Sequence, residues 1–345
     1  NIFRGQVKMQ GTLRKLKSSL TEPVQYHLPV GDNLVDLNAL IGKELTLTFS
    51  GTILCSNCGK KTKKSYSQGH CFVCMRKLAS CDMCIMKPET CHYDKGTCRE
   101  PQWGEENCMI PHYVYLANTS GLKVGITRHT QIPTRWVDQG ATQALPIFKV
   151  QTRLQSGLVE VALAEFIADK TNWRNMLKGQ NEAIDLKAAA AELIPQISDK
   201  LNELSELFGA TAIEQLDEDV VDLNFPVTEY PTKISSFNFD KNPVVSGVLQ
   251  GIKGQYLIFD SGVIKIDDNK IMVIATDPIS IIPSLNIRDS AWLSVHLLAS
   301  DIMTSGIKPI YASINFNLPP EIQDSYFKQY WNHMTNEFNN LDISV

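Results

Sequence analysis

The clearest pattern in the first half of the chain is the alternation of hydrophobic and polar positions. In "KELTLTFSGTILC", residues 43–55, every second position over Leu45, Leu47 and Phe49 is apolar, which is typical of a half-buried β-strand. Two further strands, "YVYLA" and "LKVGIT" at residues 113–117 and 122–127, flank a turn that contains Asn, Ser and Gly. The pattern predicts a small β unit at the start and a β-hairpin after residue 112.

Helical spacing follows the hairpin. In residues 158–169 the apolar side chains recur at intervals typical of one helix face, and a longer amphipathic pattern covers residues 182–208. Pro195 is expected to kink or split the longer helix, and Gly209 is expected to end it. A strand pattern then returns over residues 244–266, so the sequence predicts an α+β protein.

Composition adds a division into domains. With 345 residues the chain exceeds what one core usually serves, and 43% hydrophobic with 20% charged residues describes a globular protein. Five parts are predicted: a β unit (1–54), a cysteine-rich zinc module resembling a zinc ribbon (55–111), an α/β domain (112–180), a helix plus strands (181–264) and a C-terminal α/β segment (265–345).

The first four cysteines stand in "CSNCGKKTKKSYSQGHCFVC", residues 55–74. Cys55 and Cys58 form one pair, Cys71 and Cys74 form another, and each pair is separated by two residues. This gap lets both thiolates of a tight knuckle bind one ion, and two knuckles complete a tetrahedron suited to Zn²⁺. We predict a structural zinc site; disulfides or free core thiols are the alternative.

The following stretch, "CDMCIMKPETCHYDKGTC", adds four more cysteines and predicts a second zinc site. The predicted ligands are Cys81, Cys84, Cys91 and Cys98. The intervals at Cys91 and Cys98 are not knuckle spacings, so His92, Cys108 and His112 remain alternative donors. An iron–sulfur cluster is a further alternative.

The compartment bears on the disulfide alternative. The sequence shows no signal peptide and no apolar run long enough to span a bilayer, and its nine cysteines are an odd number. We therefore expect a cytoplasmic protein without a membrane partner, in which the cysteines are reduced.

Charge gives one candidate binding surface. The net charge of −4 argues against a uniformly basic nucleic-acid coat, but the loop between the first two knuckles is basic. Its lysines, the candidate nucleic-acid contacts, are Lys60, Lys61, Lys63 and Lys64. A solvated loop that contributes only to solubility is the alternative.

The hairpin resembles a known superfamily. "YVY" followed by "KVG" looks like a diverged form of the paired strand motifs of GIY-YIG nucleases, "PTRW" supplies an arginine, and "EVALAE" resembles the glutamate helix; the resemblance covers about residues 112–178. It implies that Tyr115 helps to activate water, Arg135 contacts phosphate and Glu165 holds Mg²⁺, with Glu160 as a neighbour. Lys123 stands where the second motif has its tyrosine.

Two wider resemblances accompany this one. The arrangement from the cysteine knuckles to "KVGITR" and "DQGA" resembles a bacterial family of unknown function over about residues 9–264. Residues 263–345 resemble the N-terminal domain of the aminoimidazole-ribonucleotide-synthase-like (PurM-like) superfamily, which implies ATP and Mg²⁺ as cofactors and a homodimer as partner. Its metal-binding positions match Asp260, Asp277 and Asp301.

The function predicted from these features is a zinc protein that binds nucleic acid through a degenerate GIY-YIG-like site, with weak or no Mg²⁺-dependent nuclease activity. Two alternatives from other classes stay open. One is an ATP- and Mg²⁺-binding enzyme of the synthase-like superfamily, and the other is a structural interaction protein.

Overall fold

The structure is a computed structural model of the chain. It describes residues 9–343 apart from 68, 180–181, 267–269, 276–277, 281–284, 304–314 and 318–321. It describes only the backbone at residues 270–275, 278–280, 298, 300–303 and 315–317.

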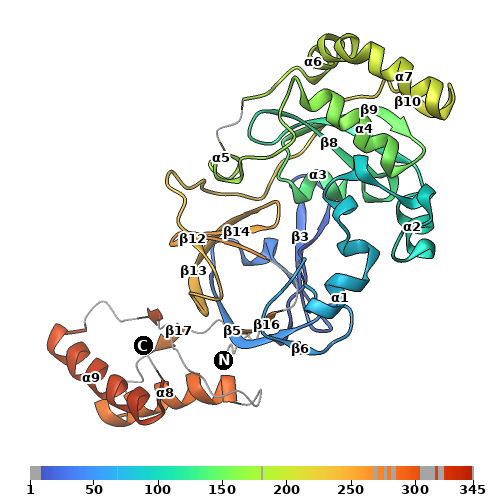
Figure 1. Cartoon of the computed structure of the whole chain (residues 1–345). Helices are drawn as coiled ribbons and strands as arrows, with labels where there is room; N and C mark the ends of the chain where they lie inside the picture. Colours follow the sequence, from blue (N-terminus) through green and yellow to red (C-terminus); the bar gives the residue numbers. More distant parts are fainter. Residues whose placement is uncertain are drawn as a thin grey trace.

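Strands from the start of the chain and strands from residues 236–275 form one mostly antiparallel sheet (Figure 1). Among the described residues it has eight strands, in the order β1-β16-β5-β13-β14-β15-β12, with β6 beside β5. The strands are β1 (Met9–Thr12), β5 (Glu44–Leu54), β6 (Lys61–Thr62), β12 (Ser236–Phe237), β13 (Val244–Lys253), β14 (Tyr256–Phe259), β15 (Gly262–Lys265) and β16 (Lys270–Ala275). The alternation in residues 43–55 therefore does form a strand, β5, and its Leu45 and Leu47 are buried.

Strand β16 lies beyond the boundary expected at residue 265. It pairs with both β1 and β5, so that Val273 lies opposite Gln10 on one side and Thr48 on the other. The sheet that begins near the N-terminus is therefore completed by residues that the sequence assigned to the C-terminal segment.

A smaller sheet packs with this one. Its strands, in the order β2-β3-β4, are β2 (Lys17–Ser19), β3 (Gln25–Val30) and β4 (Asn33–Asp36), followed by the 3-10 turn η1 (Asn38–Leu40). Leu13, Tyr26 and Leu28 from this region join Leu249 and Phe259 of the large sheet in one core.

The cysteine-rich segment connects the large sheet to the hairpin with short helical turns. In chain order they are α1 (Phe72–Lys77), η2 (Ala79–Cys81), η3 (Met83–Ile85), η4 (Pro88–Thr90), η5 (Tyr93–Lys95) and α2 (Pro101–Asn107). Such a segment has little regular backbone pairing of its own.

A second sheet carries the predicted hairpin. Its order is β10-β9-β7-β8 with β11 beside β9, and its strands are β7 (His112–Asn118), β8 (Leu122–Arg128), β9 (Gln143–Val150), β10 (Ile213–Gln215) and β11 (Val221–Asp222). Strands β7 and β8 are antiparallel and pair over their full length, from His112 opposite Arg128 to Asn118 opposite Leu122. The hairpin prediction is confirmed.

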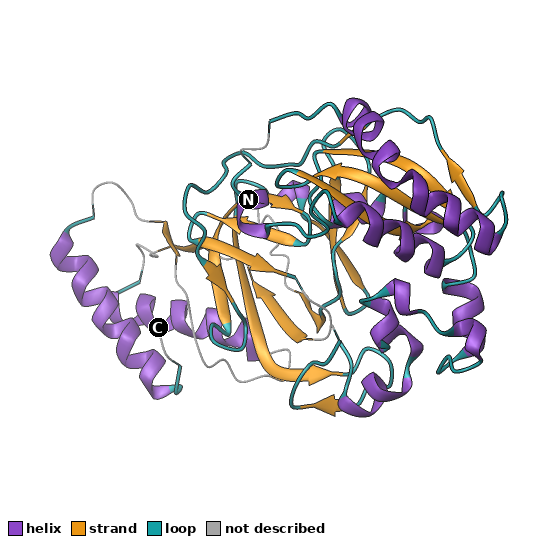
Figure 2. Cartoon of the chain, turned by 45° about the horizontal axis from the view of Figure 1, so that its top comes forward, coloured by secondary structure: helices purple, strands orange, loops and turns teal. Residues whose placement is uncertain are grey.

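Several helices follow the hairpin in sequence, and some of them pack on one face of this sheet (Figure 2). They are η6 (His129–Gln131), α3 (Thr134–Asp138), α4 (Arg153–Ala164), α5 (Trp173–Leu177), α6 (Leu186–Leu193), η7 (Ile194–Ile197) and α7 (Ser198–Phe208). The expected long helix is split at η7, which contains Pro195, because proline cannot continue the hydrogen bonding of an α-helix. Gly209, with a φ of 98°, follows the end of α7 as expected.

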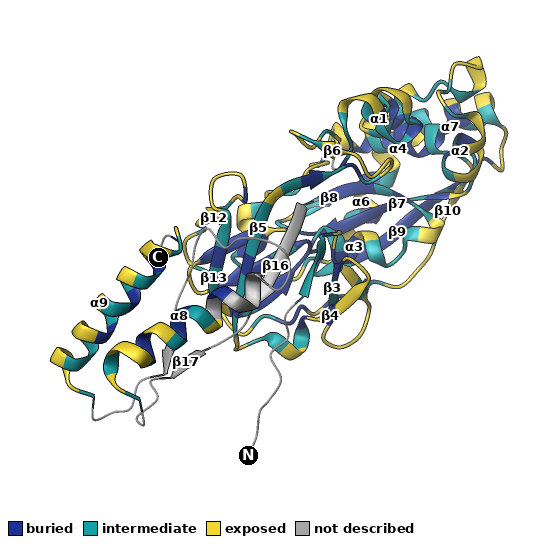
Figure 3. Cartoon of the chain, turned by 90° about the horizontal axis from the view of Figure 1, so that it is seen from below, coloured by how far each residue is buried: buried dark blue, intermediate teal, exposed yellow. Residues whose placement is uncertain are grey.

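The two faces of the hairpin sheet belong to different cores, and β7 is accordingly buried along almost its whole length (Figure 3). Val114 and Leu116 pack against α4 and α6, whereas Tyr115 and Ala117 join the core of the large sheet. Since successive side chains of a strand point to opposite faces, β7 links the two halves of the molecule.

The C-terminal region has a core of its own among the described residues. Helices α8 (Ile287–Met303) and α9 (Asp324–Asn340) pack together, and β17 (Pro278–Ser280) pairs in parallel with β18 (Asn315–Asn317). Val295 and Met334 are completely buried, and the hydroxyls of Ser294 and Tyr330 are hydrogen-bonded at 2.6 Å. The mixed α+β class with several sheets is confirmed.

Candidate metal centre and hairpin site

The first four cysteines converge on one point. One sulfur each from Cys55, Cys58, Cys71 and Cys74 lies within 4.8 Å of the other three. Cys55 follows β5, and Cys71 occupies the N-cap of α1, where its sulfur accepts a hydrogen bond from the backbone N–H of Cys74. These four residues could hold a metal ion.

Local backbone geometry brings the two knuckles together. The Cys71 N–H donates to the Cys55 sulfur at 3.2 Å, and Ser56 donates both its N–H and its hydroxyl to the Gly69 carbonyl at 2.7 Å. Gly59 has a φ of 69°, which favours glycine in the turn after Cys58. The spacing read from the sequence therefore has a direct structural cause.

Hydrogen bonds also stabilise the thiolate form of Cys55. Burial raises the pKa of Cys55, but backbone N–H groups of Cys58, Cys71 and Asn57 outweigh it and lower that pKa to about 6. The Asn57 amide acts in the same direction on Cys74, yet burial and the neighbouring sulfurs raise the pKa of Cys74 to about 12. A bound cation would remove this competition for protons, because it stabilises every coordinating thiolate. Four thiolates in a closed cluster fit a structural Zn²⁺ ion.

The second group of cysteines is arranged differently from its prediction. The predicted ligands Cys84, Cys91 and Cys98 line one small cavity together with Cys108, which the sequence offered only as an alternative. Cys81 lies away from it, with its sulfur 3.6 Å from Nδ1 of His70. His112 is also not part of the lining; it is completely buried, and its Nδ1 lies 2.8 Å from the Ile110 carbonyl oxygen.

The lysines of the loop between the knuckles are all exposed, as a nucleic-acid contact requires. They are Lys60, Lys61, Lys63 and Lys64. Exposure is also what a solvated loop would show, so nucleic-acid binding here stays a prediction.

The hairpin gathers three of the residues named by the GIY-YIG resemblance. Tyr115 on β7 and Lys123 on β8 are both buried, and Arg135 on α3 is exposed. Gln139 connects two of them: its amide is hydrogen-bonded to the Tyr115 hydroxyl at 3.0 Å and, in its favourable orientation, accepts from Arg135 at 3.0 and 3.1 Å. Gly125, opposite Tyr115, leaves room for the ring, since a Cβ there would lie 2.7 Å from the Tyr115 hydroxyl.

The carboxylate that interacts with this group is Glu160. Burial raises the pKa of Glu160 to about 7, although the positive charges of Lys123 and Arg135 act against that rise. Glu165, which the resemblance named as the metal ligand, is exposed at the C-cap of α4. Of the two glutamates, Glu160 is therefore the one that lies near Lys123 and Arg135.

Electrostatics make the hairpin site unusual. Lys123 is only 4% exposed, and burial together with the nearby Arg135 lowers its pKa to about 8. Burial raises the pKa of Tyr115 to about 12, against the influence of Arg135. Two neighbouring cations destabilise each other, while the carboxylates of Glu160 and Asp169 act in the opposite direction on Lys123.

Of the three aspartates that match the C-terminal superfamily, the structure describes the side chain of Asp260. Asp260 lies at the turn between β14 and β15, where its carboxylate accepts a hydrogen bond of 3.1 Å from the Val248 N–H. Asp301 belongs to α8, but its side chain lies outside the described residues, as does Asp277 altogether.

Together, these features define a mixed α+β protein with a cysteine cluster that could hold a metal ion. Residues 42–274 match the family described as "Protein of unknown function (DUF2797)". This match covers more than half of the chain, so the chain belongs to the DUF2797 family. Residues 259–345 match "AIR synthase related protein, N-terminal domain".

Both wider resemblances seen in the sequence thus correspond to family matches, which overlap at residues 259–274. No curated protein and no solved structure matches the chain. In the part of the chain that the structure describes, no helix is long and apolar enough to cross a membrane.

Proposed function

We propose that the chain is a zinc protein that binds nucleic acid, with a structural Zn²⁺ ion at the first four cysteines and a phosphate-binding site at the hairpin. The observation that carries this proposal is the group formed by Tyr115, Lys123, Arg135 and Glu160, in which the buried Lys123 lies near the exposed Arg135. A phosphate oxygen would satisfy both cations.

The same group argues for binding rather than efficient cleavage. A nuclease needs a cation beside the phosphate and a group that activates the nucleophile. Glu160 is a candidate ligand for Mg²⁺ or Mn²⁺, but Lys123 replaces a tyrosine of the superfamily motif, and the pKa of Tyr115 is raised. Because one positioned acid–base group contributes a factor of about 10² to 10⁴, we expect weak or no cleavage while binding persists.

Titration of labelled DNA and RNA over a range of salt concentrations tests the proposal. Affinity should fall as salt rises, because each phosphate contact releases counterions. Arg135→Gln should weaken binding and reduce the slope of log affinity against log salt concentration by about 1, the value for one phosphate contact. Lys200→Gln, on α7, should change neither the affinity nor the slope.

The loop lysines have their own matched pair of variants. Replacing Lys60, Lys61, Lys63 and Lys64 by Gln should weaken binding further, and replacing the same four by Arg should preserve it, since the charge is retained. Affinity that is absent at low salt, or insensitive to Arg135→Gln and to the four Gln substitutions, would contradict nucleic-acid binding.

A second candidate function concerns the C-terminal segment. The match of residues 259–345 favours ATP and Mg²⁺ binding there, with dimerisation through the same segment. Mg²⁺-dependent ATP binding, lost in Asp301→Asn, together with a dimer in sedimentation would support this function. A monomer that binds no ATP at millimolar concentration would exclude it.

A further inference from the structure

The cavity in the second cysteine group is enclosed mainly by sulfur and aromatic side chains. It has a volume of about 10 Å³, and Cys84, Cys91, Cys98 and Cys108 are among the residues that line it. Gly104 forms part of the wall without a side chain, because a Cβ there would lie 2.8 Å from the Tyr93 ring and 3.3 Å from the Cys98 sulfur. Four cysteines therefore line one small cavity, and the missing side chain of Gly104 lets the Tyr93 ring and the Cys98 sulfur pack closely at its wall.

The four cysteines come from different elements. Cys84 belongs to η3, Cys91 follows η4, Cys98 lies between η5 and α2, and Cys108 is the C-cap residue of α2. The thiols of Cys91 and Cys108 affect each other's protonation, and burial together with the charges of Cys91 and Cys98 raises the pKa of Cys84. Nothing in the local sequence spacing would bring these four together.

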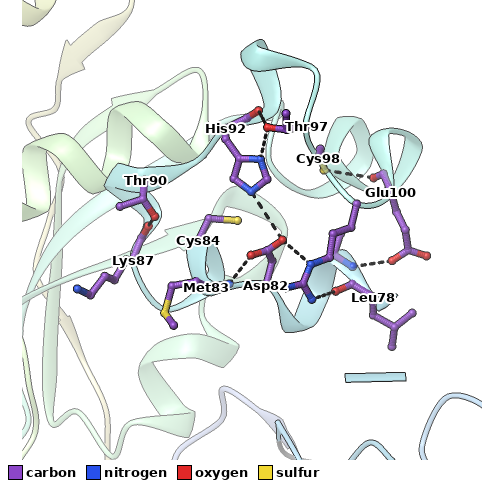
Figure 4. A network of polar contacts seen from close by, with 12 residues as sticks. Leu78, Asp82, Met83, Cys84, Lys87, Thr90, His92, Thr97, Cys98 and Glu100 are labelled. Carbon is purple, nitrogen blue, oxygen red and sulfur yellow. Dashed lines mark hydrogen bonds and ion pairs between the residues drawn. The ribbon is translucent and has the colours of Figure 1, made fainter. Parts of the chain in front are cut away.

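The other potential ligands at the rim are already engaged (Figure 4). Nδ1 of His92 lies 2.7 Å from the Thr97 hydroxyl, and its Nε2 lies 3.6 Å from the Asp82 carboxylate. Asp82 in turn forms an ion pair with Arg99 at 2.7 Å and accepts from the Met83 N–H at 2.6 Å. Asp82, Cys84 and His92 do lie within 4.8 Å of one another, but two of these three already have other partners.

We infer that Cys84, Cys91, Cys98 and Cys108 form a second, tetrathiolate metal site, and that Cys81 is not one of its ligands. Thiolates select Zn²⁺ among the common cellular divalent ions of fixed valence, and four of them close a tetrahedral site. The cavity, about 10 Å³ in volume, has room for a single ion. His92 and Asp82 would then support the site from its edge.

This ion would join the cysteine module to α4. Arg153, the first residue of α4, donates its side-chain Nε to the Cys84 carbonyl at 3.5 Å and Nη2 to the Ile85 carbonyl at 2.7 Å. Its backbone N–H donates to the Cys108 carbonyl at 2.8 Å. The ion would therefore fix two residues that anchor the start of α4, the helix that carries Glu160.

Metal content of purified variants under reducing conditions tests the ligand set. The wild-type chain should contain two zinc ions, Cys98→Ser and Cys108→Ser should each contain one, and Cys81→Ser and His92→Ala should still contain two. A Cys108→Ser protein that retains two ions, a Cys81→Ser or His92→Ala protein that loses one, or a wild-type chain with one ion would overturn the inference.

Co²⁺ substitution keeps the inference testable if a ligand variant does not fold. In the Cys81→Ser protein the visible spectrum should show two equivalents of a tetrahedral thiolate site, and Cys81 of the wild-type protein should be alkylated while the four ligands are protected. Iron with a brown chromophore would overturn the single-ion site. A disulfide between Cys91 and Cys108 in the reduced, metal-loaded preparation would overturn it as well.

Discussion

The two cysteine groups differ in how closely their sulfurs converge: four sulfurs of the first lie within 4.8 Å of one another, whereas those of the second line a common cavity. In the first group, the knuckles are held by bonds within one short stretch, such as that from the Cys71 N–H to the Cys55 sulfur. In the second group, the sulfurs line a cavity whose walls depend on a helix far along the chain, through Arg153 and Gly157. A metal site can thus be local, and readable from spacing, or assembled by packing.

The packing of the second group on α4 is close. A Cβ on Gly157 would lie 2.4 Å from the backbone nitrogen of Glu89 and 2.8 Å from the Cβ of Pro88, so that only glycine lets η4 approach this far. Helix α4 is in turn fixed at its start by a capping box, in which the Thr152 and Gln155 side chains bond each other's backbone N–H groups. The second group therefore inherits its geometry from α4.

Removal of metal should reveal the largest difference in stability between the two cysteine groups. With a zinc chelator, we expect the amide hydrogens of Phe72–Lys77 to lose their protection from exchange. The reason is that structural zinc contributes on the order of 10 kcal/mol or more to the folding free energy of such a module. Helix α2 (Pro101–Asn107) should lose less, since Arg153 still holds the segment. Hydrogen exchange followed by mass spectrometry measures both, with α9 as the internal control. Equal loss in the two segments would remove the distinction.

The contacts of Arg153 give the next largest effect. In Arg153→Gln the charged hydrogen bond to the Ile85 carbonyl is lost, which should cost about 1.5–3 kcal/mol and speed release of the second metal ion only. Chemical denaturation and zinc competition with a chromogenic chelator measure the two effects. The matched control is Arg76→Gln in α1, where the guanidinium lies 5.9 Å from the Phe72 ring. A control variant that releases zinc just as quickly would contradict the assignment.

Gly157→Ala tests the packing itself. Alanine improves helix propensity by up to about 1 kcal/mol, but overpacking against backbone atoms costs about 1–3 kcal/mol, so we expect a net loss of up to about 2 kcal/mol. Val161→Ala, at an exposed position of the same helix, should change the free energy of unfolding by no more than about 0.5 kcal/mol. A Gly157→Ala protein that is more stable than wild type would show that η4 is free to move away from α4.

The last expected effect depends on pH and concerns Glu160, farther along α4. Its folded pKa of about 7 lies above the ordinary value of 4.5, so the folded state binds an extra proton between these values. The resulting stability is fully present below pH 4.5 and is lost as pH rises through about 7. Glu160→Gln should flatten this pH dependence and Glu165→Gln should leave it unchanged, as measured by urea denaturation across the range. If Glu165→Gln flattened the pH dependence and Glu160→Gln did not, Glu165 would be the buried carboxylate.

The sequence was most informative where a feature depends on near neighbours. The alternation that forms β5, the hairpin of β7 and β8, and the interruption at Pro195 all follow from intervals of a few residues. The cluster of Cys55, Cys58, Cys71 and Cys74 belongs to the same class, because each knuckle closes over two residues and only one loop separates the pair.

The sequence was least informative where a choice depends on how helix α4 is rotated and what packs on it. Glu160 and Glu165 are five residues apart, which on a helix means about 140° around the axis, so both cannot face the hairpin. Only the packing of Val159 and Leu163 in the core decides that Glu160 does. In the same way, Cys81 and Cys108 are equivalent as donors, and only contact with α4 and α2 brings Cys108 to the cavity and leaves Cys81 beside His70.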